Sequence, residues 1–178
     1  MQKDCVTLFD QLETRRKILF KKLDLVDTDL LAFSPGIKKW SVLQVCYHLI
    51  RSEELSLVYL QKKISYDTHI QPAGIGSVIR SALLYWALRL PFKLPAPKRV
   101  AEFPGDLQWP QLKTQWIQIR NGIKAVIENL PEGYDKKLVY RHPFSGRMTL
   151  YQMLTFFDAH IHRHEKQIEL LITETSLP

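Results

Sequence analysis

The segment TLYQMLTFFDAHIHRHEKQIELLIT, residues 149–173, decides the fold of this chain. It opens with Thr149-Leu-Tyr-Gln152, which has the pattern of a capping box at a helix start. Behind this box, apolar residues recur three or four positions apart, which is the spacing of one helical face. We therefore predict one long amphipathic helix over residues 149–173. Its buried face contains Leu150, Met153, Leu154, Phe157, Ile161, Ile168 and Leu171.

Three more segments show the same helical periodicity. The first covers about residues 4–25, the second begins at a further capping box, Ser41-Val-Leu-Gln44, and the third covers 112–130 between two prolines. A long connection with a further short helix near 75–90 joins the second to the third. Residues 137–141 give only a weak strand signal, without a convincing pairing partner. The sequence predicts an all-α, four-helix bundle with a long crossover, and one domain over residues 1–178 in which 71–105 form a basic, proline-containing connector.

The composition is that of an ordinary globular domain. The chain has 178 residues, of which 46% are hydrophobic and 24% charged, and it has two cysteines, Cys5 and Cys46. These values exclude a disulfide-stapled miniprotein and a disordered chain. The chain opens without an apolar leader, so we expect a cytoplasmic protein. The longest apolar run, residues 82–88, is far shorter than the ~20 residues of a membrane span, so no transmembrane segment is expected.

The positive charge is concentrated in the middle of the chain. The formal net charge is +7, and residues 61–124 contain 10 basic and 3 acidic residues. Within them, RLPFKLPAPKR (89–99) combines four cations with three prolines. Such a segment can attract nucleic acid, anionic lipid or a negatively charged small substrate. A solvated, proline-stiffened loop is the simpler interpretation. Nucleic acid is not the expected partner, because the cations lack the aromatic and motif context of nucleic-acid modules.

Histidines on the predicted helices indicate a metal site. His160 and His164 are four residues apart and continue the apolar face, whereas His162 should point outward. His48 lies two turns into the second helix, and a bundle can place ligands from facing helices around one centre. Three neutral imidazoles leave open coordination positions, which is typical of a catalytic site for Zn, Ni, Fe or Mn. The alternative is a set of hydrogen-bonded core histidines. Cys46 is expected to fill the core.

The same residues resemble a known family. Trp40-Ser41 followed by His48-Leu49, and HPFSGRMTLYQMLTFFDAHIHRHEKQI (142–168), resemble the signatures of the DinB/YfiT-like metalloprotein superfamily. The resemblance covers nearly the whole chain. It implies a four-helix bundle in which His48, His160 and His164 hold a divalent metal. Members include thiol-dependent transferases, isomerases and hydrolases, and their bundles often pair, so a homodimer is one expected assembly.

These observations support a metal-dependent enzyme that acts on a small-molecule substrate. The reaction would be either transfer of a low-molecular-weight thiol or hydrolysis, with a thiolate or a water at the metal's open positions. Neither cysteine is placed to supply the thiolate, so a thiol would be a cosubstrate. Catalytic residues are not identified, but four side chains are candidates for orienting ligands or carrying protons: Glu53, His142, Asp158 and Gln167.

A second hypothesis gives the protein no catalytic role. In this hypothesis the chain is a binding module whose metal is vestigial, and its basic, apolar connector docks on a membrane surface or an acidic partner. The contact residues would be Trp86, Leu90, Arg80, Arg89 and Lys93.

Overall fold

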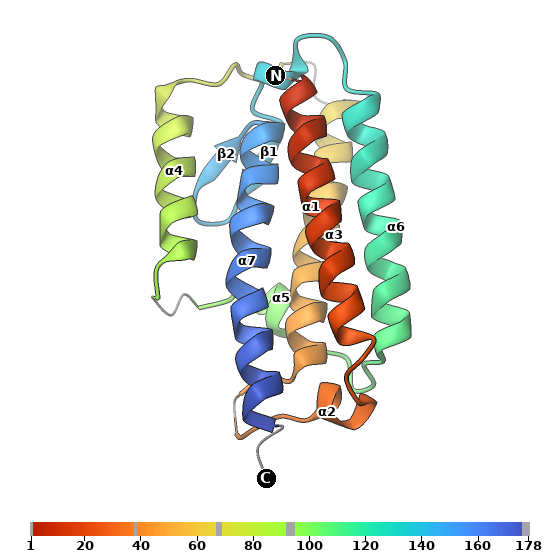
Figure 1. Ribbon diagram of the computed structural model, residues 1–178. Coiled ribbons are helices and arrows are strands. Elements are labelled where there is room, and N and C mark those ends of the chain that lie inside the picture. The colour runs from red at the N-terminus through yellow and green to blue at the C-terminus, as the bar shows by residue number, and fades with distance from the viewer. Residues whose placement is uncertain (1, 38, 67–68, 92–94, 176–178) are drawn as a thin grey trace.

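The structure is a computed structural model that describes residues 2–37, 39–66, 69–91 and 95–175. Four long helices lie side by side along the molecule (Figure 1). α1 (Gln2–Leu23) contacts α6 (Trp109–Glu128) and α7 (Leu150–Thr175), and α3 (Val42–Tyr66) contacts the same two helices. The predicted all-α class is confirmed, and all four long helices lie where the periodicity places them.

Both predicted capping boxes are present. The hydroxyl of Ser41 accepts a hydrogen bond from the backbone N–H of Gln44 at 3.2 Å, and the Gln44 side chain accepts one from the N–H of Ser41 at 2.9 Å. Thr149 and Gln152 form the same reciprocal pair at 3.2 and 3.0 Å. Each pair satisfies two N–H groups that a helix start leaves without partners. α3 and α7, the two helices that carry the candidate histidines, therefore begin at defined residues.

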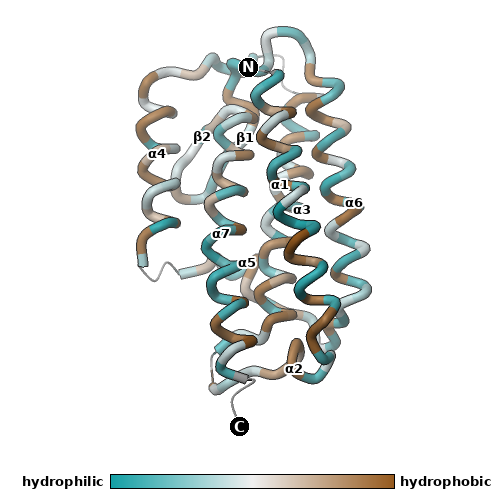
Figure 2. Tube along the Cα trace, viewed as in Figure 1, coloured by the Kyte–Doolittle hydropathy of each residue, from teal (hydrophilic) through white to brown (hydrophobic). Residues whose placement is uncertain are grey.

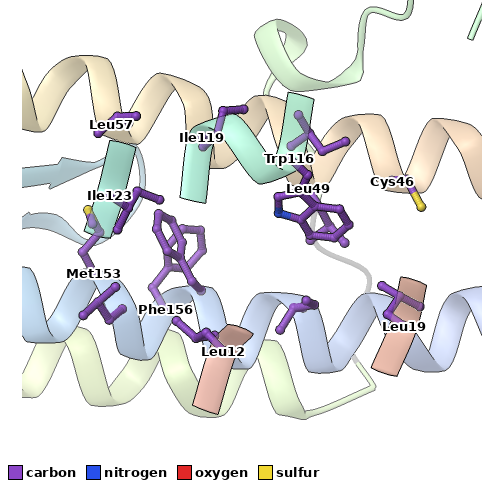
Figure 3. Packing of buried hydrophobic residues seen from close by; sticks show 14 of the residues in the cluster. Leu12, Leu19, Cys46, Leu49, Leu57, Trp116, Ile119, Ile123, Met153 and Phe156 are labelled. Atoms are coloured by element: carbon purple, nitrogen blue, oxygen red, sulfur yellow. The ribbon is translucent and has the colours of Figure 1, made fainter. Parts of the chain in front are cut away.

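The core lies between the four long helices. Apolar and polar residues alternate along each helix with the helical period (Figure 2). Side chains from different helices fill the interior, among them Leu49 of α3 and Trp116 of α6 and, further along the core, Met153 of α7 (Figure 3), and each of these three is fully buried. Among the described residues, no helix combines the length and the hydropathy that a membrane span requires.

A small hairpin precedes α7 and corrects the sequence analysis. β1 (Tyr140–His142) pairs antiparallel with β2 (Gly146–Met148), whereas we expected no partner for residues 137–141. Strands of three residues are too short to show the alternation on which strand prediction depends. The turn ends at Gly146, whose φ of 73° lies in the left-handed region that glycine adopts without strain.

Shorter elements complete the connections. α2 (Thr28–Ala32) links α1 to α3, and a 3₁₀ turn (Tyr134–Lys136) lies between α6 and β1. The connector contains the predicted extra helix, α4 (Ile75–Arg89), which packs on the outside of α7 and against β2 (Figure 1). The chain then reaches α5 (Lys98–Ala101), which contacts α3. This route brings the connector beside His48, whose Nδ1 lies 2.9 Å from the backbone carbonyl of Val100.

Candidate metal centre

Three histidines from two helices converge on one point. His48 of α3 lies opposite His160 and His164, which are one turn apart on α7. The Nε2 atom of His160 is 3.0 Å from Nε2 of His48 and 3.2 Å from Nε2 of His164. All three side chains are buried, with exposed fractions of 4%, 8% and 8%. The structure thus brings together the three residues that the sequence analysis singled out for a metal ion.

The far nitrogen of two of these rings has a partner that fixes the tautomer. Nδ1 of His48 is 2.9 Å from the backbone carbonyl of Val100 in α5, and Nδ1 of His164 is 2.8 Å from Oε1 of Gln167. A carbonyl oxygen can only accept, so Nδ1 donates in both rings. The proton is therefore on Nδ1, and Nε2 presents a lone pair to the centre.

These tautomers favour a cation at the centre. Because Nε2 of His48 and of His164 carry no proton, only His160 can donate in the two contacts between the rings, and a single N–H cannot satisfy both well. Nitrogen ligands ~2.0–2.1 Å from a tetrahedral zinc ion lie about 3.3 Å apart, close to the 3.0 and 3.2 Å observed here. The three residues therefore fit a divalent metal ion.

Burial keeps the three rings neutral. Desolvation lowers the pKa of His48, and it lowers the pKa of His164 to about 3, with a further reduction from the neighbouring His48. The pKa of His160 lies well below its usual value, first because of burial and then because of the other two histidines. Neutral imidazole is the form that binds a metal, so these ligands need no deprotonation near pH 7.

Aromatic rings surround the histidines. The Trp40 ring lies 5.1 Å from the His48 ring, and Phe156 stacks on His160 at 5.1 Å with an interplanar angle of 19°. Phe103, which follows α5, packs edge-on against Trp40 at 5.1 Å. Within the described residues, the cluster of metal-ligand type contains the three histidines and no carboxylate. A divalent ion held there would keep its full charge in a largely apolar surrounding.

The four other candidate residues have different surroundings. Gln167 lies beside the cluster, since it accepts the hydrogen bond from His164. Asp158 points to the outside of α7, where it pairs with Arg89 at 3.0 Å and with Arg15 at 3.5 Å. Both oxygens of Glu53 face α6 and accept hydrogen bonds from Arg120 and Trp116 at 2.6–3.0 Å. The carboxylates of Asp158 and Glu53 are therefore committed to partners outside the histidine cluster.

His142 lies one aromatic ring away from the cluster. Its Nδ1 accepts hydrogen bonds from the backbone N–H groups of Phe144 and Ser145, both at 3.2 Å, so any proton on the neutral ring is on Nε2. Its ring packs on Phe156, which in turn stacks on His160. Burial lowers the pKa of His142 to about 4. His142 is therefore a neutral histidine of fixed tautomer.

His162 and Cys46 lie outside the histidine cluster, as the sequence predicts. His162 is half-buried and is not part of the cluster, as its position two residues from both His160 and His164 requires. Cys46 is fully buried, and desolvation raises its pKa to about 12, so it fills the core as expected. Sequence reasoning missed Val100, because a backbone carbonyl leaves no signal in a sequence. It also missed the contact of Trp40 with His48, although Trp40 belongs to the family signature.

The fold and the cluster together define a class of protein: a helical bundle with a candidate metal centre between two of its helices. Within that class, the model of the DinB superfamily matches residues 11–168, and the chain belongs to this family. The matched range contains all three histidines. No significant match was found among curated proteins or among solved structures. The family expected from the sequence signatures is thereby confirmed.

Proposed function

We propose that the protein is a divalent-metal-dependent enzyme whose ion is held by Nε2 of His48, His160 and His164. The observation that carries this proposal is the convergence of the three Nε2 atoms, two of them with tautomers fixed by Val100 and Gln167. Hydrogen-bonded core histidines, the alternative, would leave lone pairs facing one another in a buried place, which is costly.

The chain's own residues have clear tasks in this proposal. When bound, a divalent ion with three neutral ligands supplies an open position that activates a water or a thiol as nucleophile. Val100 and Gln167 orient His48 and His164, while Trp40 and Phe156 limit the access of bulk water to the rings. His142 presents an Nε2–H that is available as a neutral hydrogen-bond donor.

If the reaction uses a thiol, the burial of both cysteines indicates that this thiol comes from outside the protein. Cys5 and Cys46 are both fully buried, and burial raises their pKa values to about 11 and about 12. Neither forms a thiolate near neutral pH. A low-molecular-weight thiol would therefore enter as a cosubstrate, to be conjugated to a soft electrophile. Hydrolysis of an ester or amide is the second reaction that the same donor set supports.

Metal content tests the first part of the proposal. Elemental analysis of gently purified protein should find about one Zn, Ni, Fe or Mn ion per chain. His160→Ala and His164→Ala should remove it, whereas the matched variant His162→Ala, which lies between them on the same helix, should keep it. Equal loss from all three variants would contradict the proposed ligand set.

Parallel assays test the reaction. Metal-loaded protein, metal-free protein and His48→Ala would be compared for conjugation of small thiols to electrophiles, and for hydrolysis of ester and amide panels without thiol. We expect only the metal-loaded protein to accelerate one of the two. Equal inertness of all three samples toward both panels would contradict an enzymatic function.

The non-catalytic hypothesis has less support. Two of the cations assigned to a docking surface contact the protein itself: Arg89 pairs with Asp158 at 3.0 Å, and Nε of Arg80 donates to the carbonyl of Ser145 at 2.9 Å. Lys93 lies outside the described residues. Trp86 and Leu90 remain exposed, and they belong to a larger apolar face.

A further inference from the structure

The outer face of α4 is apolar along its whole length. Figure 1 shows this helix at the edge of the molecule, beside α7. Its most exposed large side chains are Ile75 at 80%, Leu83 at 65% and Trp86 at 61%. At 100° per residue, they share one side of the helix with the remaining exposed apolar residues of this segment. We call this the α4 face, and it comprises Ile75, Val78, Ile79, Ala82, Leu83, Trp86 and Leu90.

The pattern of α4 is the reverse of that expected for a solvated helix. Its buried side carries two small polar residues, Ser77 and Ser81, together with Leu88. That side packs against α7 and β2. A helix at the surface of a monomer normally turns its large apolar residues toward the core and its polar residues outward. Here most of the large apolar residues face away from the bundle, which indicates that another surface covers them.

The α4 face lacks charged side chains that point outward to meet a charged partner. α4 contains no acidic residue. Its two arginines engage the bundle, since Arg80 donates to the Ser145 carbonyl, and Arg89 pairs with Asp158 and lies over the Tyr85 ring at 4.6 Å. Helices that lie on anionic membranes carry lysine and arginine along their polar side. The polar side of α4 is turned against α7, so the face fits an apolar protein surface better than a lipid headgroup layer.

The size of the face fits a protein interface. Phe144, at the tip of the hairpin that Arg80 contacts, is a further exposed apolar residue at 68%. The six large side chains of the α4 face, each 45–80% exposed, present on the order of 700 Å² without Phe144, compared with ~800 Å² per partner in a standard interface and ~300–600 Å² for the largest apolar patch of a typical monomer. The surface is therefore large enough for a stable dimer.

We propose that a second copy of this chain covers the α4 face. An uncharged, elongated apolar stripe is complementary to itself, and a two-fold axis brings the same patch of both subunits together. With the axis near Ala82 and Leu83, the middle of the stripe, the two α4 helices cross antiparallel, and Trp86 packs against Ile79 of the partner subunit. This proposal does not depend on metal binding or on catalysis.

Sedimentation velocity and light scattering test the interface on the full chain. We expect wild-type protein to be a dimer of 20.9 kDa chains, and Leu83→Glu/Trp86→Glu to raise the dimer dissociation constant by about 100-fold or more, because a buried interface excludes charges. Val58→Glu is the matched control, since Val58 is an exposed apolar residue of α3 (58%) outside the face. Circular dichroism verifies that every variant is folded. A monomeric wild type, or a dimer that survives the double substitution, would overturn the proposal.

Two further measurements sharpen the result. Ala82→Cys places an exposed thiol beside the proposed axis, and both native cysteines are buried, so oxidation should give a disulfide-linked dimer. Failure to cross-link would overturn the antiparallel arrangement. Co-sedimentation with anionic phospholipid vesicles examines the lipid alternative. If the wild type is monomeric without lipid and binds the vesicles, and if the double substitution abolishes this binding, the face would be assigned to a membrane instead.

Discussion

In two of the three imidazoles, the hydrogen bond made by Nδ1, the nitrogen that points away from the cluster, fixes the tautomer. His48 and His164 both donate from Nδ1 to an oxygen, at 2.9 and 2.8 Å, and so present a lone pair at Nε2. The two partners differ in kind, because one is a backbone carbonyl of the connector and the other is a side chain of α7. Only the second can be removed by a simple substitution.

Replacing Gln167 should weaken the metal site without removing a ligand. In Gln167→Ala the Nδ1 proton of His164 loses its acceptor, so the ring is less well oriented and less basic. We expect metal affinity to fall by about 10-fold or more, measured by competition with a chromophoric chelator. Gln167→Glu keeps an acceptor oxygen and should retain most of the affinity. Equal affinities for wild type and Gln167→Ala would show that this hydrogen bond does not act on the metal.

His142 should make the stability of the metal-free protein depend on pH. Its pKa falls from 6.5 in the unfolded chain to about 4 in the folded protein, because it is buried. Between these values the unfolded state binds a proton that the folded state does not, so the free energy of unfolding decreases as the pH falls below 6.5. The slope is at most ~1.4 kcal/mol per pH unit. Well above pH 6.5 the ring is neutral in both states and contributes no slope.

The variant His142→Asn isolates this contribution. The asparagine Oδ1 can accept the same two backbone hydrogen bonds from Phe144 and Ser145, but it does not titrate. Urea unfolding of both proteins at pH 7, 6 and 5, with a chelator present, should show a smaller loss of stability for the variant. The buried cluster histidines, whose pKa values are also lowered, give the free energy of unfolding a pH dependence of the same sign in both proteins. Identical slopes would contradict the assignment to His142.

Among the helices, the contact of α3 with α6 contains a buried ion pair. Both oxygens of Glu53 accept hydrogen bonds from Arg120 at 2.6 Å, and both residues have exposed fractions of 2% or less. Trp116 donates a third hydrogen bond at 3.0 Å. Breaking such a pair from one side leaves the Arg120 charge buried, with the Glu13 carboxylate, 3.5 Å from its Nη1, as the remaining partner. Glu53 therefore ties two helices of the core together.

Neighbouring glutamates provide a matched test of this role. Glu53→Ala should lower the free energy of unfolding by about 3 kcal/mol, because the Arg120 charge stays buried with only the more distant Glu13 carboxylate to compensate it. Glu54→Ala removes a carboxylate one residue away whose pair with Arg51 is about one-third exposed, and should cost less than about 1 kcal/mol. Chemical denaturation of the metal-free proteins measures both. A Glu53 variant as stable as the Glu54 variant would show that the pair contributes little.

A feature of this fold could be predicted from the sequence when the residues that form it lie within a few positions of one another. The long helices and both capping boxes could be predicted because their signals repeat within a few residues, as in Thr149-Leu-Tyr-Gln152. The pairing of His160 with His164 is equally local. Glu53 shows where such reasoning ends: its place near His48 suggested an orienting role, but its partners lie 63 and 67 residues further along the chain. The hairpin could not be predicted because its strands have only three residues each. The contact of the Val100 carbonyl with His48 could not be predicted because a backbone atom leaves no signal in the sequence.

For the molecule as a whole, the histidine cluster joins two helices that are distant in sequence. His48 and His160 are 112 residues apart, so an ion held between α3 and α7 would close a long loop of the folded chain. The unfolded chain does not hold the three nitrogens together, and binding is therefore coupled to folding. An ion that binds only the folded state stabilises the entire bundle rather than one site.

Metal should therefore raise the global stability of the protein. At a free metal concentration 1,000 times the dissociation constant, the free energy of unfolding should increase by about 4 kcal/mol, and a chelator should reverse the increase. His160→Ala should lose this gain, because it lacks one of the converging nitrogens, whereas His162→Ala should keep it. Leu83→Glu/Trp86→Glu should also keep it, since the α4 face lies on the far side of α4 from α7 and takes no part in the cluster. Thermal unfolding with and without metal, at fixed protein concentration, measures this gain in stability. If His160→Ala retained the gain, the ion would have to bind away from the three histidines.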